Sequence, residues 1–266
     1  MTFQQYVDNP MGKKNAVFSQ RDIYKSQYTK RFDVIYLREA GNMRYTLYKD
    51  KKNDTFYVHI KIPSEVIPKF YYDVVIKFET KNNGLRVSNS LKEYDVRFFS
   101  NDPAFVFTFE HVFHKNGMFI EELSPKASKL ALKNFPKEKN RFGIPGYVKS
   151  IYFAWIFMNR KNLFSKYMYD QVGQPYNVKI LLDNIDDTDK KIADRQEKGV
   201  ELEKQKSKLK RAKEDAAISS AKARQAALNG ENNNDTHRIK ITDKTKTIKP
   251  VSSVNKIKKI VNGKKK

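Results

Sequence analysis

The aromatic residues of this 266-residue chain end at Tyr176, and this boundary most constrains its fold. All 34 Phe, Tyr and Trp residues lie at or before that position. Large aromatic side chains supply much of the apolar surface that a globular core buries. We therefore predict one globular domain over residues 1–177 and no aromatic-anchored core in the rest of the chain.

The segment after this boundary has the composition of a long polar helix. Residues 178–229 lack proline, contain Gly199 as their single glycine, and are rich in residues that favour helices. Leucine or alanine recurs there every seven residues, but the companion positions are mostly polar. Both a paired helix and a solvated single helix therefore stay open. Residues 230–266 are polar and lysine-rich, and we predict a flexible tail.

Alternating apolar and polar residues predict strands between residues 43 and 114. Turn signals such as KNNG at 81–84 separate them. One face of the predicted sheet is apolar, whereas the other carries charged residues. We therefore predict an antiparallel sheet with one buried and one solvent-exposed face. The strand patterns cover four segments: 55–62, 71–80, 93–99 and 104–114.

Helices are predicted before and after this sheet. One starts near residue 20 with Ser19 as its cap, and segment 32–40 fits helix or strand equally. Another covers 124–134, with Ser124 as cap and Pro125 in the first turn. Further helical segments are expected at 151–158, which is too short to span a bilayer and fits a buried helix or strand, and at 162–170. Helices covering the apolar face give an α+β fold.

The chain carries 53 basic and 30 acidic residues, a formal net charge of +23. Such a balance indicates an anionic partner, which could be nucleic acid, an acidic membrane surface or an acidic protein. Residues 1–185 hold 30 basic and 18 acidic residues (+12), residues 186–230 hold 12 and 9 (+3), and residues 231–266 hold 11 and 3 (+8). Lysines outnumber arginines 41 to 12, which suits contact with phosphates better than reading of bases. An A/T-rich genome, bacterial or viral, would favour the same composition.

The absence of cysteine excludes disulfide frameworks, cysteine-type zinc fingers and iron–sulfur clusters. The first 15 residues, MTFQQYVDNPMGKKN, lack the apolar stretch of a signal peptide, and we expect no transmembrane segment. The expected location is the cytoplasm, or a virion assembled in the host cytoplasm.

Catalytic patterns are weak throughout the chain. A strand over 104–114 would place His111 and His114 on opposite faces, whereas a helix would place them on one face, where they could bind a metal with a carboxylate. Asp73 and Glu79 share a strand face but lie roughly 20 Å apart along it. The acidic segment 183–191 lacks the spacing of a calcium loop and fits the start of a helix better. We therefore predict no catalytic site, no metal site and no cofactor.

Our leading hypothesis is a non-enzymatic structural or assembly protein that contacts nucleic acid electrostatically, as a bacteriophage virion component. Partners would be nucleic acid, without sequence preference, and protein neighbours or further copies of the chain. One alternative is a cytosolic RNA- or DNA-binding regulator that uses the polar sheet face, with Tyr57 or Tyr71 stacking on bases. A third is a metal-dependent nuclease assembled from Asp73, Glu110 and His114. The predicted nucleic-acid-binding residues are nine tail lysines and three cations of the sheet: Lys244, Lys246, Lys249, Lys256, Lys258, Lys259, Lys264, Lys265, Lys266, Lys61, Lys77 and Arg97.

Overall fold

The computed structural model describes the greater part of the chain. The described residues are 1–8, 18–39, 42–80, 88–136, 140, 143 and 145–231, with the backbone alone for 18–24 and 227–231. The chain divides into two compact units, Met1–Ser207 and Lys208–Lys266. The first unit is an α+β fold, as the sequence predicted.

A five-stranded mixed sheet lies at the centre of the first unit. Its order is β4-β3-β2-β1-β5, and every pairing is antiparallel except that of β1 with the two-residue strand β5. The predicted strands 55–62, 71–80 and 93–99 are confirmed as the antiparallel strands β2, β3 and β4, whereas β1 and β5 lie outside the predicted segments and β5 adds the parallel pairing. The strands are β1 (Tyr45–Asp50), β2 (Thr55–Pro63), β3 (Tyr71–Glu79), β4 (Asp95–Ser100) and β5 (Gln174–Pro175).

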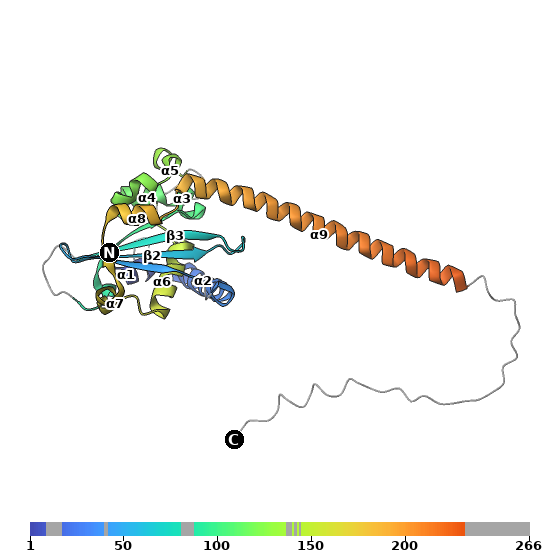
Figure 1. Cartoon of the computed structure of the whole chain (residues 1–266), viewed down its shortest axis with the longest axis horizontal. Coiled ribbons are helices and arrows are strands. Elements are labelled where there is room, and N and C mark those ends of the chain that lie inside the picture. Colours follow the sequence, from blue (N-terminus) through green and yellow to red (C-terminus); the bar gives the residue numbers. More distant parts are fainter. Residues whose placement is uncertain are drawn as a thin grey trace, which may run out of the picture. The chain divides into compact units, whose positions relative to one another are not determined.

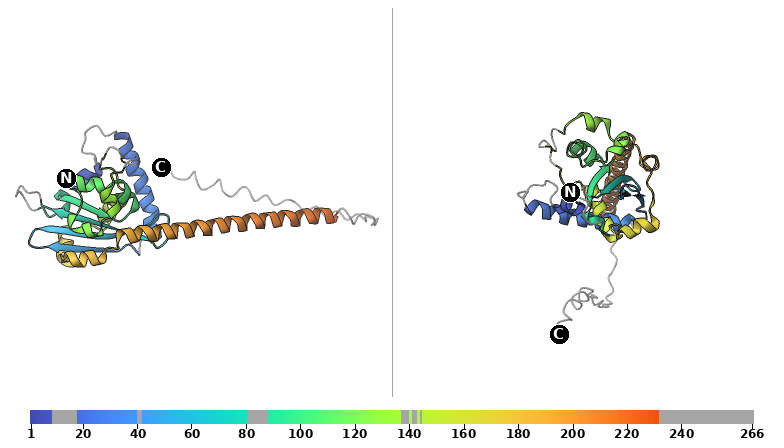
Figure 2. Two further views of the ribbon diagram at one scale, coloured as in Figure 1. Left: turned by 90° about the horizontal axis from the view of Figure 1, so that it is seen from above. Right: turned by 90° about the vertical axis from the view of Figure 1, so that its left-hand side faces the viewer.

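Two helices cover the apolar face of the sheet. Helix α6 (Lys149–Arg160) contacts β2, β3 and β4, and it also packs against α2 (Phe18–Glu39). Phe153 of α6 meets Phe32 of α2 with ring centroids 5.5 Å apart. Figure 1 and Figure 2 show α2 and α6 together on one side of the sheet. The apolar segment 151–158 is thus a buried helix, and segment 32–40, which the sequence left open, is helical as far as Glu39.

The opposite face of the sheet is also covered, so the prediction of a solvent-exposed face is wrong. The ring of Tyr176 stacks on Tyr57 at 4.1 Å between centroids, and Phe119 packs against Phe99 at 5.9 Å. Tyr57 also donates a hydrogen bond to Glu122 of the 3₁₀ helix η2 (Glu121–Lys126) at 2.7 Å. In Figure 1, α8 (Val178–Asn184) lies on this side of the sheet.

The predicted strand over 104–114 is also wrong, because this segment forms α3 (Pro103–Thr108) and α4 (Glu110–Lys115). The Asp102 carboxylate accepts a hydrogen bond from the Ala104 amide at 3.1 Å, and Pro103 occupies the first turn. An acidic cap followed by proline is a strong helix start. The alternating phenylalanines resemble a strand pattern, but Phe107 faces solvent.

Local capping differs from prediction at two further helix starts. The helix predicted from Ser124 is α5 (Lys129–Lys133), and Ser128 caps it by accepting a hydrogen bond from Ala131. Pro125 lies inside η2 instead. Ser19 lies within α2, one residue after its first position.

The polar segment after residue 177 forms two helices, α8 and α9 (Thr188–Glu231), rather than one continuous helix. Asn177 caps α8, and Asp187 accepts a hydrogen bond from the Lys190 amide at 2.9 Å. The acidic segment 183–191 therefore caps a helix, as its sequence indicated. The remaining helical elements are α1 (Phe3–Asp8), η1 (Leu91–Glu93) and α7 (Lys166–Val172). None of the helices in the described ranges is long and apolar enough to cross a lipid bilayer.

Candidate nucleic-acid interface

The three sheet cations predicted to contact nucleic acid are held in salt bridges with carboxylates. Lys77 Nζ lies 2.7 Å from Glu79 Oε1 and 2.8 Å from Glu122 Oε1, and its side chain is 13% exposed. Arg97 Nε lies 2.8 Å from Glu79 Oε2. Because these carboxylates already neutralise the cations, this face offers little free positive charge to phosphate.

The aromatic residues proposed for base stacking are equally engaged. Tyr57 is 3% exposed. Tyr71, which is half-buried, donates its hydroxyl hydrogen to Glu39 at 3.0 Å. A base would have to displace Tyr176 in order to stack on Tyr57. The geometry therefore gives no support to a regulator that reads nucleic acid on the sheet.

Lys61 belongs to a buried polar network centred on Asp73. The Asp73 carboxylate accepts hydrogen bonds from His59 Nε2 at 2.7 Å, Asn101 Nδ2 at 2.8 Å and the Asp186 amide at 3.1 Å. Lys61 Nζ lies 3.1 Å from the same carboxylate. Sequence reasoning missed Asn101 and Asp186, because neither is near Asp73 in the chain.

The electrostatics of this network favour an ionised Asp73. Burial alone raises the pKa of the Asp73 carboxyl, but the hydrogen bond and charge of His59, the charge of Lys61 and the Asp186 amide outweigh it. The pKa falls to about 2 as a result. The network joins β2 and β3 to the chain between α8 and α9. The network therefore stabilises the packing of these elements against one another.

The residues considered for a metal-dependent nuclease do not form a metal site. His111 and His114 lie on the same short helix, but His114 pairs with Glu121 at 3.1 Å while His111 meets the edge of Phe135. Glu110 is buried and accepts a hydrogen bond from the Ser128 amide at 3.1 Å. Within the described ranges, no three His, Asp or Glu side chains are grouped so that they could hold a metal ion.

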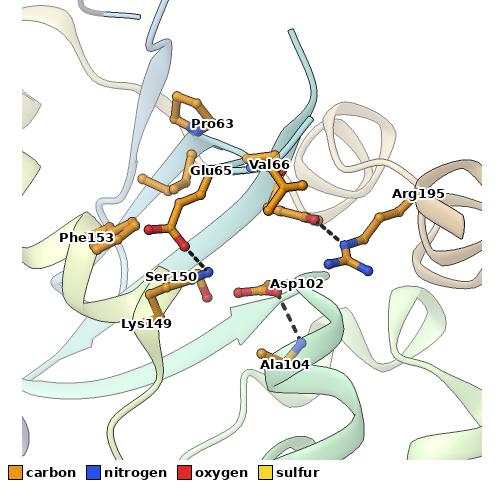
Figure 3. Close-up of a pocket in the computed structure, with 12 residues that line it drawn as sticks. Pro63, Glu65, Val66, Asp102, Ala104, Lys149, Ser150, Phe153 and Arg195 are labelled. Carbon is orange, nitrogen blue, oxygen red and sulfur yellow. Dashed lines mark hydrogen bonds and ion pairs between the residues drawn. The ribbon is translucent and has the colours of Figure 1, made fainter. Parts of the chain in front are cut away.

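A small pocket of about 90 Å³ lies where the ends of β2 and β3 meet α6 and the first turns of α9. Glu65 and Lys149 point toward one another across it and are 2.6 Å apart (Figure 3). Arg195 donates a hydrogen bond to the Tyr72 hydroxyl at 2.7 Å. A nucleotide needs a cavity of several hundred Å³. The pocket is therefore too small for one, and Glu65 already pairs with both Lys149 and Arg31.

Positive charge is less compensated in the second unit. Residues 1–207 hold 36 basic and 25 acidic residues (+11), whereas residues 208–266 hold 17 and 5 (+12). The second unit thus has more than half of the net charge in less than a quarter of the chain. Among its described side chains, 208–226, one salt bridge is present, between Lys210 and Glu214 at 3.9 Å. The nine predicted tail lysines, Lys244 to Lys266, lie outside the described residues.

No protein family model matches this sequence, and neither a curated protein nor a solved structure is significantly similar to it.

Proposed function

We propose that this protein is a non-enzymatic structural or assembly protein that contacts nucleic acid through the positive charge of its second unit. The observation that supports the proposal is the different state of the cations in the two units. The cations of the sheet in the first unit are paired with carboxylates, whereas residues 208–266 hold 17 basic residues against 5 acidic ones. Charge that the protein itself does not neutralise is available to an anionic partner.

The proposed mechanism is the neutralisation of phosphates with release of counterions. Each lysine that contacts a phosphate displaces condensed cations from the nucleic acid, so the affinity depends steeply on salt. Lysine is a compact, strongly hydrated charge that fits phosphate and reads bases poorly. Binding without sequence preference is the expected consequence, and it suits a protein that packs or holds nucleic acid.

The first unit would then serve as the anchor to protein neighbours. Two apolar side chains of α2, Val34 and Leu37, are 67% and 83% exposed. Residues three apart share a face of a helix, and exposed apolar side chains side by side on one face support a protein–protein contact. In this proposal the assembly is a bacteriophage particle, consistent with a composition typical of A/T-rich genomes.

Removal of the tail tests the electrostatic contact. A variant ending at residue 231 keeps every described helix and strand and loses 11 basic and 2 acidic residues. We expect its affinity for a random-sequence duplex to fall at least about tenfold, because several phosphate contacts are lost. An unchanged affinity would show that the tail takes no part.

The assembly role has its own test. We expect the native protein to sediment with a particle, and the absorbance ratio of that fraction at 260 and 280 nm to show nucleic acid. A native protein that sediments as a free monomer without nucleic acid would contradict this role.

A further inference from the structure

The described part of the second unit, residues 208–226 of α9, has two opposite faces of different character. Residues three and four apart share a face of an α-helix. Leu209, Lys213, Ala216, Ser220 and Arg224 follow this spacing and form what we call the basic face. This face contains two cations and no carboxylate.

The opposite side of the helix is what we call the mixed face, formed by Arg211, Asp215, Ile218, Lys222 and Gln225. It also contains two cations, but Asp215 lies on it and Glu214 lies beside it. Its five residues therefore carry a net charge of +1, against +2 on the basic face.

The basic face also offers close approach to a polyanion. Ala216 and Ser220 have short side chains, and both are exposed. The longer side chains of Lys213 and Arg224 extend from the same face on either side of this pair, 11 residues apart. At 1.5 Å per residue this separation is about 16 Å. A negatively charged rod can therefore lie along the helix and meet both cations.

The composition of the second unit argues against single-stranded nucleic acid and against a membrane surface as its partner. A single strand is usually held by aromatic side chains that stack on its bases, and no Phe, Tyr or Trp follows Tyr176. A membrane-surface helix needs a broad apolar face, whereas Leu209 is the one large apolar residue of the basic face. A duplex presents about one negative charge per 1.7 Å of its axis and needs neither feature.

We propose that the basic face of α9 binds the phosphate backbone of double-stranded nucleic acid. This inference rests on the proposed function and adds to it the surface and the form of the ligand. The mixed face points away from the duplex in the bound state. Its cations contribute only through the long-range field, which salt screens.

The two faces provide a matched experiment in the full-length protein. Lys213→Gln with Arg224→Gln removes one Lys and one Arg, 11 residues apart, from the basic face. Arg211→Gln with Lys222→Gln removes the same two residue types at the same separation from the mixed face. Glutamine favours helices, and far-UV circular dichroism checks that both variants keep the helix content of the wild type.

The readout is fluorescence anisotropy of a labelled random-sequence duplex at several salt concentrations, with a single strand of equal length as a second probe. We expect the basic-face variant to weaken duplex binding about tenfold or more near 0.1 M salt and to lower the salt slope by about 2. The mixed-face variant should change affinity less than about threefold, with an unchanged slope.

Three outcomes separate this inference from the proposed function. Equal losses of duplex affinity in the two variants would contradict the assignment of the basic face, but they would be consistent with electrostatic binding by the second unit. Tighter binding of the single strand than of the duplex would overturn the choice of ligand. A wild-type protein that binds neither probe would overturn the proposed function together with this inference.

Discussion

At the scale of single residues, the buried carboxylate of Asp73 determines how the middle of the fold responds to acid. The unfolded carboxyl takes up a proton near pH 4, whereas the folded one does so near pH 2. The ionised form therefore stabilises the fold above about pH 4, and this contribution is lost as the pH falls toward 2. The shift corresponds to about 2.5 kcal/mol of stability at neutral pH.

The substitution Asp73→Asn tests this contribution. Loss of the charge removes the carboxylate partner of His59 and the nearer of the two carboxylates beside Lys61, so we expect the free energy of unfolding to fall by about 3 kcal/mol at neutral pH. The difference from wild type should shrink as the pH approaches 2, as measured by urea denaturation. Asp170→Asn, which breaks the exposed ion pair with Lys49, is the control and should cost less than about 1 kcal/mol. Equal losses in both variants would contradict the assigned role of the network.

In contrast to Asp73, whose pKa is lowered, the carboxyl of Glu110 has a raised pKa. Burial raises the pKa of its carboxyl to about 8; the Ser128 amide opposes this shift, and the charge of Asp189 adds to it. One oxygen, Oε2, is buried and has no hydrogen-bond partner. The folded state therefore keeps a proton that the unfolded chain releases near pH 4. Stability must decrease as the pH rises from about 4 to 8.

Glu110→Gln should remove this dependence. Glutamine is neutral at every pH and resembles the protonated acid, so we expect the variant to gain stability over wild type as the pH rises from about 5 to 8. The gain should approach about 1.4 kcal/mol per pH unit. Thermal unfolding at a series of pH values measures it, with the exposed Glu197→Gln as control. Parallel pH profiles of wild type and variant would refute the raised pKa.

At the scale of elements, one tyrosine joins the N-terminal helix to the chain that leads into α6. Tyr6 of α1 is 1% exposed; its hydroxyl donates to the Gly146 carbonyl at 2.8 Å and accepts from the Val148 amide at 3.2 Å. Tyr6→Phe removes both hydrogen bonds and leaves the buried Val148 amide without this acceptor, so we expect the free energy of unfolding to fall by about 1–3 kcal/mol. Tyr167→Phe on the exposed surface of α7 should change the free energy of unfolding by less than about 0.5 kcal/mol. Chemical denaturation compares the two variants. An unchanged free energy of unfolding for Tyr6→Phe would show that the hydrogen bonds of the Tyr6 hydroxyl do not stabilise the fold.

Elements with a strong local signal could be predicted from the sequence. Strands β2 and β3 alternate over nine residues each, and the apolar segment within α6 is buried all round. The strand prediction for segment 104–114 was wrong because its phenylalanines recur every second residue, whereas Asp102 and Pro103 start a helix there.

The cover over the second sheet face could not be predicted, because it comes from distant parts of the chain. Tyr176 and Asp186 lie more than a hundred residues from the strand positions that they contact. The salt bridge between Lys77 and Glu122 in the candidate site could not be predicted either, because the two residues are far apart in the sequence and only the fold brings them together. Periodicity identifies which residues share a face, but it does not show what packs against that face.

At the scale of the whole molecule, the division of the charge depends on where the chain is divided. By sequence segment, residues 1–185 hold more of the excess (+12) than the tail of residues 231–266 (+8). Counted by the compact units, residues 208–266 hold slightly more than all the preceding residues together. The change comes mainly from residues 208–230, whose 6 basic and 2 acidic residues add +4 to the tail, whereas residues 186–207 are nearly neutral with 6 basic and 7 acidic residues. The described part of α9 after Ser207 therefore joins the tail as a source of positive charge.

The central claim is that the second unit binds nucleic acid by neutralising phosphates, and the salt dependence of affinity tests it most directly. Binding of the full-length protein to a random-sequence duplex is measured from about 50 to 200 mM salt, and log K is plotted against log salt concentration. With about six phosphate contacts or more, we predict a straight line of slope about −5 or steeper, and a loss of affinity of about a thousandfold. A slope near zero, or no binding at the lowest salt, would contradict the account.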